Sequence, residues 1–161
     1  MQNKLNSLKL RMKDNNVDLV VLGPGTHMNW LLGFNPYPDE RPCMLLIGKE
    51  KEAFLMPSVN AEDARKRTDI AINSWNDENG PDQALKEALL YIGESSAKHI
   101  AIDEAMRSHF ALIVIEALPN PTYEFTGSTI GALRMRKDQA EFINLKENAL
   151  IDDRAMQAGF A

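Results

Sequence analysis

Cysteine is nearly absent from this sequence, because Cys43 is the single cysteine among 161 residues. One cysteine cannot form an internal disulfide, which excludes the disulfide-stabilised secreted domains and leads us to expect a reducing, cytoplasmic location. No apolar run approaches the ~20 residues that a membrane-spanning helix needs. The N-terminal stretch also lacks the apolar core of a signal peptide. We therefore expect no association with a membrane.

A surplus of basic residues is also missing, since 18 Lys and Arg stand against 23 Asp and Glu, for a formal net charge of -5. Proteins that bind nucleic acid normally present a basic face, so this balance argues against a nucleic-acid partner. The hydrophobic fraction of 44% and the charged fraction of 25% are typical of a globular protein. The length suits one domain with a hydrophobic core.

The motifs of the common catalytic and cofactor sites are absent as well. His27, His99 and His109 have none of the close spacings of a zinc site. Gly23-Pro24-Gly25 matches the first two glycines of a dinucleotide-binding loop, but Met28 stands where the third glycine would allow close helix–strand packing. A plain strand-to-helix turn is the favoured interpretation over a nucleotide site. From the residues alone we assign no catalytic residue and no metal ligand.

Helix and strand patterns alternate along the chain. Apolar residues at helical spacing indicate helices, and short apolar runs between turn residues indicate strands. In chain order we expect a first helix up to Asn15, a strand at 18–22, a short helix at 26–32 that Thr26 caps, a hairpin of 43–47 and 53–56, a helix at 58–67, a strand at 70–72, a helix behind Pro81, a strand at 99–103, a helix at 104–118, a strand at 122–125 and a last helix that Asp138 and Glu141 cap. This order predicts an α/β fold, a three-layer domain with a mixed β-sheet and helices on both faces.

Three segments, read in order, resemble the creatinase, prolidase and aminopeptidase P family. Residues 8–22 resemble the helix-then-strand opening of these chains, and residues 29–34 (NWLLGF) resemble their N-aromatic-L-x-G-F motif. Residues 133–142 (LRMRKDQAEF) are similar to the family's LR-x-x-K-x-x-x-E-hydrophobic hinge, which precedes a long helix. The resemblance implies a creatinase/prolidase-like N-terminal domain over 1–132. Residues 133–161 would be the hinge and the first helix toward a C-terminal catalytic domain that is absent here.

The resemblance also implies where the chemistry lies. In the family, a C-terminal pita-bread domain binds two divalent metal ions (Mn, Co or Zn) on two Asp, one His and two Glu residues, and such metal pairs activate water. This chain would then be the non-catalytic N-terminal domain of a Xaa-Pro dipeptidase or aminopeptidase. It would hold no cofactor and be inactive alone. The parent enzyme would act on short peptides with proline at the second position, and we expect a homodimer.

In relatives that dimerise, the loop after the G-F pair reaches toward the partner subunit's active site and narrows access to short peptides. Here that loop is Asn35 to Pro42, and its three prolines restrict its conformation. A stiff loop loses less freedom when it meets a substrate. Within the loop, Arg41 suits a peptide carboxylate. The candidate substrate-access residues are Asp39, Glu40, Arg41, His27 and Asn29.

Two other interpretations stay open. The loop charges are alternatively solvated and without function, and Asn29 alternatively braces the short helix. The whole chain is alternatively a stand-alone peptide- or protein-binding module of the same fold without peptidase activity.

Overall fold

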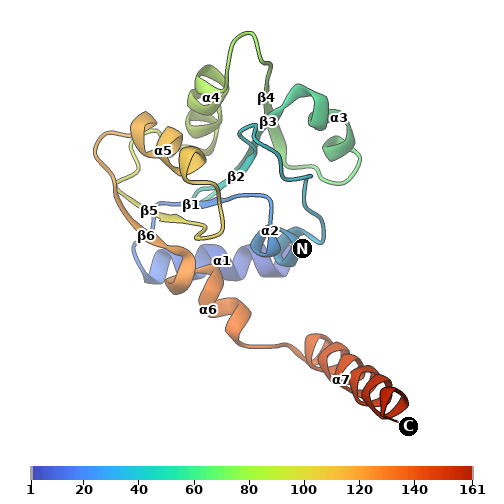
Figure 1. Ribbon diagram of the computed structural model, residues 1–161. Helices are drawn as coiled ribbons and strands as arrows, with labels where there is room; N and C mark the ends of the chain where they lie inside the picture. Colours follow the sequence, from blue (N-terminus) through green and yellow to red (C-terminus); the bar gives the residue numbers. More distant parts are fainter. Residues whose placement is uncertain (1, 161) are drawn as a thin grey trace.

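Helices and strands alternate in nearly the predicted order over residues 2–160, the part that this computed structural model describes (Figure 1). In chain order the elements are α1 (Gln2–Asp14), β1 (Leu19–Leu22), α2 (Thr26–Leu32), β2 (Met44–Ile47), β3 (Glu52–Pro57), α3 (Ser58–Arg65), β4 (Ala71–Trp75), α4 (Asp82–Ile92), β5 (His99–Ile102), α5 (Ser108–Ala117), β6 (Thr122–Phe125), the 3-10 turn η1 (Thr126–Ser128), α6 (Ile130–Met135) and α7 (Gln139–Gly159).

The strands of the described residues form one mixed sheet in the order β4-β3-β2-β1-β5-β6. β1 pairs parallel with β5, and β5 pairs parallel with β6. β2 runs antiparallel to both of its neighbours, β1 and β3, and forms with β3 the predicted hairpin. Because parallel strands end on the same side, the carboxyl ends of β1, β5 and β6 meet at one edge of the sheet.

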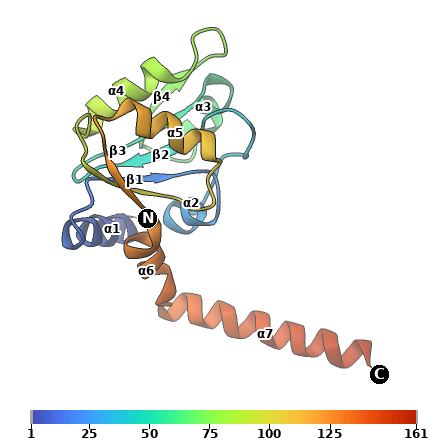
Figure 2. The same cartoon turned by 60° about the vertical axis from the view of Figure 1, so that its left-hand side comes forward.

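Helices bury both faces of the sheet, which confirms the three-layer α/β prediction (Figure 2). α1, α2 and α3 contribute buried side chains to one core, and α4 and α5 contribute to the other. β1 alternates between them, since Val20 and Leu22 belong to the first core whereas Leu19 and Val21 belong to the second. A strand buried on both faces needs apolar residues at every position, which explains the continuous apolar run in the sequence.

Several helix ends follow directly from the local sequence. Gly33 and Gly93 follow α2 and α4 with φ of 78° and 82°, in the left-handed region where a Cβ would be strained. Asn16 takes φ of 54° after α1. At the start of α7 the Asp138 side chain accepts the N–H of Glu141, and the Glu141 carboxylate accepts the N–H of Asp138. This capping box confirms the predicted helix start.

Two local predictions are wrong. The helix expected at 104–118 begins only at Ser108, because the preceding residues form a turn. The Asp103 carboxylate accepts the N–H of Ala105 at 2.9 Å, and its carbonyl accepts the N–H of Met106 at 3.1 Å. Thr26 does not cap α2, since its hydroxyl oxygen accepts a hydrogen bond from Arg134 at 3.1 Å instead.

Helix α6 has no counterpart among the predicted elements. It is six residues long and contains Gly131, which lowers intrinsic helix propensity. Ile130 is fully buried and Leu133 packs against the core that α1 and α2 share. Tertiary packing of these two side chains stabilises α6, although the local sequence pattern does not predict a helix there.

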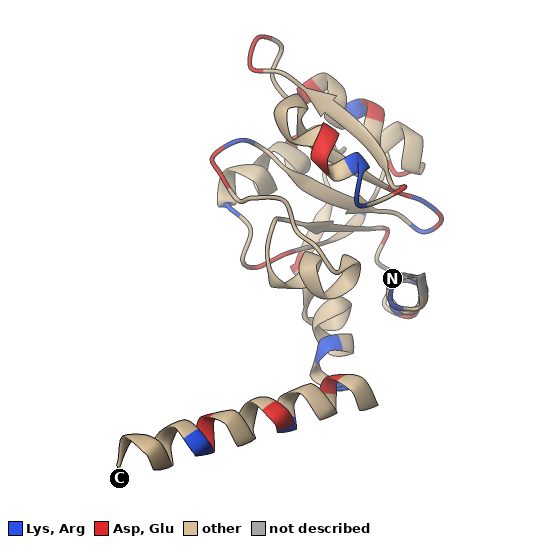
Figure 3. Ribbon diagram, turned by 90° about the vertical axis from the view of Figure 1, so that its right-hand side faces the viewer, with Lys and Arg blue, Asp and Glu red and all other residues tan. Residues whose placement is uncertain are grey.

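Helix α7 extends away from the body in both views (Figures 1 and 2) and buries none of its side chains. Basic and acidic residues are interspersed along it (Figure 3). Large apolar side chains are exposed as well, among them Phe142 at 57%, Leu145 at 51% and Met156 at 58%. Within residues 2–160, α7 and the other helices are too short or too polar to cross a membrane.

Candidate functional site

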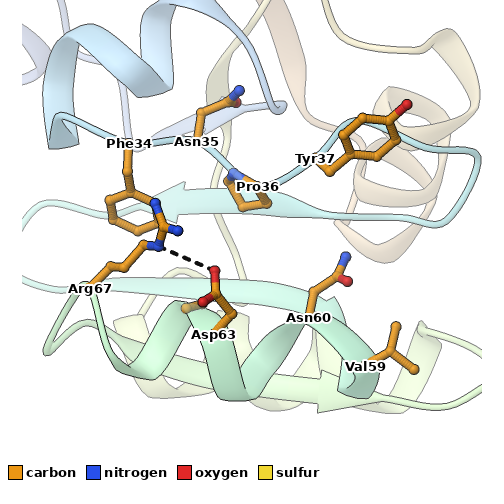
Figure 4. A pocket seen from close by; sticks show the side chains of 9 residues that line it. Phe34, Asn35, Pro36, Tyr37, Val59, Asn60, Asp63 and Arg67 are labelled. Carbon is orange, nitrogen blue, oxygen red and sulfur yellow. Dashed lines mark ion pairs between the residues drawn. The ribbon is translucent and has the colours of Figure 1, made fainter.

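The proline-rich loop of Asn35 to Pro42 joins α2 to β2, and its first part lies across from α3 (Figure 4). A pocket of about 300 Å³ separates the two segments. Phe34 and Ala64 are the buried members of its lining, whereas Tyr37 is 81% exposed. The Asp63–Arg67 ion pair of 3.2 Å lies at one end.

Arg41 does not extend freely from the loop. Its Nε and Nη2 donate to the two carboxylate oxygens of Asp77, at 3.1 and 3.0 Å, in the connection between β4 and α4. These hydrogen bonds and the Asp77 charge raise the pKa of the Arg41 guanidinium. The Arg41 backbone N–H also donates to Asp39 at 2.8 Å. The Arg41 guanidinium, which we expected to bind the carboxylate of a peptide, therefore already binds the carboxylate of Asp77 in the same chain.

The neighbouring loop residue Glu40 has an exposed side chain, and its carbonyl oxygen lies 3.3 Å from Nε2 of His109 in α5. Two elements distant in sequence thus contact the loop tip, through Asp77 and His109. These contacts and the prolines of the loop both restrict the positions of Asp39, Glu40 and Arg41.

His27 lies at the carboxyl edge of the sheet rather than in the proline-rich loop. It follows β1 and is 6% exposed. Its Nε2 lies 3.2 Å from Glu104, which follows β5, and 3.3 Å from the Thr126 hydroxyl, which follows β6. The Thr126 hydroxyl donates to the other Glu104 oxygen at 2.6 Å. The three parallel strands therefore bring Glu104 and Thr126 next to His27, although they lie 77 and 99 positions after it in the chain.

Arg134 of α6 completes this polar cluster, defined as His27, Glu104, Thr126 and Arg134. Its Nη1 lies 2.8 Å from His27 Nδ1 and 3.1 Å from the Thr26 hydroxyl. A guanidinium carries only donors, so Nδ1 accepts and the proton of the neutral ring resides on Nε2. His27 then donates from Nε2 toward Glu104. A neutral imidazole bridges an arginine and a carboxylate.

The two carboxyl groups at this edge have opposite pKa shifts. Burial alone would raise the pKa of Glu104, but the Thr126 hydroxyl, its own backbone N–H and His27 stabilise the carboxylate and lower it to about 2. Burial raises the pKa of Asp103, which is 3% exposed, beyond what the Ala105 N–H and His27 offset. Glu104 is therefore an anion at neutral pH.

The donor atoms of His27, Asp103 and Glu104 all lie within 4.8 Å of one another, so we tested whether they fit a divalent cation. A metal on Nε2 requires the ring proton on Nδ1, and metal-bound histidines normally donate that N–H to an acceptor. Here Nδ1 faces the donor Arg134 at 2.8 Å. The hydrogen-bond pattern therefore does not fit a metal ligand set.

Asn29 and Trp30 follow His27 in α2. Asn29 is exposed, and its carbonyl accepts the N–H of Gly33 at 2.8 Å. Trp30 donates its indole N–H to Glu141 at 2.6 Å, and Lys4 of α1 lies 3.1 Å from the same carboxylate and 4.2 Å from the centre of the indole ring. The first turn of α7 is therefore held against α1 and α2.

Sequence reasoning named His27 but did not find its partners. Glu104, Thr126 and Arg134 have no shared local motif, and a sheet topology is needed to place them together. The rule that ligand-facing groups gather at the carboxyl ends of parallel strands would have pointed to this edge once the strand order was known.

The Creatinase/Prolidase N-terminal domain model matches residues 4–136. The chain belongs to this domain family. This creatinase/prolidase N-terminal domain has 25% sequence identity to a dipeptidase from Pyrococcus horikoshii OT3, with a TM-score of 0.75, over 85% of this chain and 38% of that one. It thus spans well under half of that enzyme's length. No curated protein matches the chain.

Two further solved structures share its fold. A prolidase from Thermococcus sibiricus has a TM-score of 0.82 at 18% identity, over 98% of this chain and 43% of that one. The creatinase/prolidase N-terminal domain of an X-Pro dipeptidase from Streptococcus pyogenes has a TM-score of 0.69 at 16% identity, over 78% of this chain and 94% of that one. Several of the matched structures therefore consist of the N-terminal domain alone.

The polar cluster and the Trp30 contact explain in physical terms how the segment 133–142 of this N-terminal domain is held. Arg134 binds the His27 side chain, and Lys137 donates to the Arg134 carbonyl. Glu141 caps α7 and accepts from Trp30 and Lys4. The basic and acidic residues of the segment 133–142 thus fix α6 and α7 to the body.

Proposed function

We propose that this creatinase/prolidase N-terminal domain is the non-catalytic part of a metal-dependent Xaa-Pro peptidase, in which it shapes substrate access and supports oligomer assembly. The family match over residues 4–136 is the observation that carries the proposal. The fold likeness to the Thermococcus sibiricus prolidase supports it, because the likeness extends over 98% of the chain and so includes most of α7. A cytoplasmic location is part of the same proposal.

In this proposal the chemistry belongs to a following catalytic domain with two divalent ions, Mn, Co or Zn. Such ions would activate water for attack on a peptide bond before proline. In the proposal the ligands to these ions come from that following domain, and among residues 2–160 the grouped donor atoms of His27, Asp103 and Glu104 do not fit a metal. Its contribution would be to position the proline-rich loop near the substrate of a partner subunit in a homodimer.

The first experiment tests the division of labour. Purified chain 1–161, supplied with Mn²⁺, Co²⁺ or Zn²⁺, should release no product from a Xaa-Pro dipeptide, while a full-length prolidase under the same conditions should hydrolyse it. Metal-dependent hydrolysis by the chain alone would refute the non-catalytic role. The reading frame beyond codon 161 should encode two Asp, one His and two Glu ligands.

The second experiment tests the loop in the full-length enzyme. Asp77→Asn removes one carboxylate charge beside Arg41 without altering a loop residue. If the loop controls access, KM for short peptides should change while kcat is retained. Glu87→Gln, an exposed charge change of the same kind on α4, is the matched control. Equal KM values for all three proteins would contradict the access role.

The pocket beside the loop is the feature that favours the alternative, a peptide- or protein-binding module. Tyr37 and Val59 line it and are 81% and 72% exposed, and an extended peptide could cover both. Titration with short peptides while the Tyr37 ring signals are observed distinguishes the two. Saturable shifts confined to this pocket in a chain whose gene encodes no metal ligands would favour the module.

A further inference from the structure

His27 stands between a cation and an anion that reach it from two other elements. Arg134 Nη1 of α6 lies 2.8 Å from Nδ1, and Glu104 Oε1 lies 3.2 Å from Nε2. The contact with Arg134 needs a lone pair on Nδ1, because a guanidinium can only donate. The contact therefore exists only while the imidazole is neutral.

We infer that His27 is a pH-sensitive latch that holds the last turn of α6, and with it the start of the hinge, only in its neutral form. A proton taken from solvent by Nδ1 removes the acceptor of Arg134 and breaks no covalent bond. It also places two like charges at the 2.8 Å contact. Acidification therefore breaks the contact between Arg134 and His27 and leaves only the 3.1 Å hydrogen bond to the Thr26 hydroxyl between Arg134 and α2, and the return to higher pH restores the lost contact. The inference concerns this chain's own residues and does not require the proposed peptidase.

The charged groups around His27 allow both states. Glu104 and Asp103, at the end of β5, attract a second proton, whereas Arg134 of α6 repels it. Thr126 of η1 is uncharged, and α2 carries no titratable residue besides His27. In the acid form the His27–Glu104 contact becomes an ion pair. Protonation of His27 thus removes its contact with Arg134, strengthens its contact with Glu104, and leaves this edge of the sheet intact.

A second set of contacts, made by Glu141, holds the start of α7 independently of His27. Glu141 binds Lys4 and Trp30 and caps α7. Burial acts to raise the pKa of Glu141, but the Asp138 N–H, Lys4 and Trp30 outweigh it and the pKa is lowered. Its carboxylate therefore stays ionised where an imidazole becomes protonated. Acidification should loosen residues 135–137 while the first turn of α7 stays in place.

Nuclear magnetic resonance on the full chain tests both parts. Ring nitrogen shifts of His27, followed downward from about pH 8, should show Nδ1 without a proton at the start and report when Nδ1 gains one. As His27 gains its proton, the backbone order parameters of Met135 to Lys137 should fall from about 0.85 to below about 0.6. Those of Gln139 to Asn144 should not change.

Two variants act as controls. His27→Gln keeps an acceptor for Arg134 and cannot gain a charge, so its order parameters should be independent of pH, although His99 and His109 are still present. Arg134→Gln should show low order parameters at Met135 to Lys137 at both pH values. A wild-type His27 with the proton on Nδ1 at about pH 8, or one that stays neutral down to about pH 5, would overturn the latch. So would unchanged order parameters after protonation, or the same loss in His27→Gln.

Discussion

Trp30 donates its indole N–H to Glu141 at 2.6 Å and so joins helix α2 to the first turn of α7. Lys4 adds a cation at 3.1 Å from the same carboxylate. α7 buries none of its side chains, so this contact and the capping box are the described hydrogen bonds that fix where the helix starts. The position of the long helix relative to the body depends on one carboxylate.

Replacing Trp30 with Phe should loosen the first turn of α7. The change removes a hydrogen bond to a charged acceptor, with a cost of about 1.5–3 kcal/mol, and leaves an aromatic ring under Lys4. Faster amide exchange at Phe142 is the expected result. Trp75→Phe is the matched control, because Trp75 donates to the Pro42 carbonyl at 2.9 Å and makes no contact with α7. Equal exchange in both variants would contradict the role of Trp30.

Thr126→Val should reduce the acid sensitivity of folding. Glu104 has a pKa of about 2 in the folded chain, below its ordinary 4.5. Its stabilising contribution is therefore present above pH 4.5 and lost as the pH falls toward 2. Without the Thr126 hydroxyl the pKa of Glu104 rises and less stability remains to be lost.

Urea unfolding at about pH 5 and about pH 3 measures this difference, since the slope with pH reports protons taken up on unfolding. Thr122→Val is the matched control, because the Thr122 hydroxyl donates to the uncharged Lys98 carbonyl at 3.0 Å. The wild type and the Thr122 variant should lose the same stability between the two pH values, and the Thr126 variant should lose less. A Thr126 variant that loses as much as the wild type would show that another group controls the shift.

Cys43 should be inert in the folded chain. It is 2% exposed, and burial raises the pKa of its thiol to about 12, with a further contribution from the Asp39 charge. Because the thiolate is the reactive form, a thiol reagent should modify the native chain only as fast as it unfolds. Ser96→Cys places a second thiol at an exposed position and should react at once. Rapid labelling of Cys43 in the wild type would contradict this burial.

Gly48→Ala should destabilise the β2–β3 hairpin. A Cβ there would lie 2.8 Å from Glu94 Cγ and 3.2 Å from the carbonyl oxygen of Ile92, so backbone as well as side chain would have to shift. Overpacking of this kind costs about 1–3 kcal/mol. At Gly127 a Cβ meets no atom within 4 Å, so Gly127→Ala should leave the unfolding free energy within about 0.5 kcal/mol. Chemical denaturation compares the two, and equal losses would argue against a steric cause.

Elements whose pattern is local were predictable from the sequence. The apolar run of β1, the glycine ends of α2 and α4 and the capping box of α7 each depend on a few adjacent residues. The start of α5 was not, because Asp103 holds its neighbours in a turn by a hydrogen bond that competes with the helix. α6 depends on packing of Ile130 and Leu133 on distant helices.

The candidate site was predictable only in part for the same reason. The proline-rich loop is visible in the sequence, but Asp77, which binds Arg41, lies 36 residues away from it. His27 was singled out, but its neighbours come from three later segments. No spacing rule connects such residues, because the strand order that brings them together is a property of the whole sheet.

The meeting of β1, β5 and β6 at one edge also has a kinetic consequence. The contacts of His27 with Glu104, Thr126 and Arg134 span 77, 99 and 107 residues of chain. Contacts that close such long loops carry the greatest entropic cost and tend to form after local structure. We therefore expect the polar cluster to form late in folding. Substitutions there should speed unfolding more than they slow folding, so Arg134 attaches α6 only to a body whose sheet is already complete.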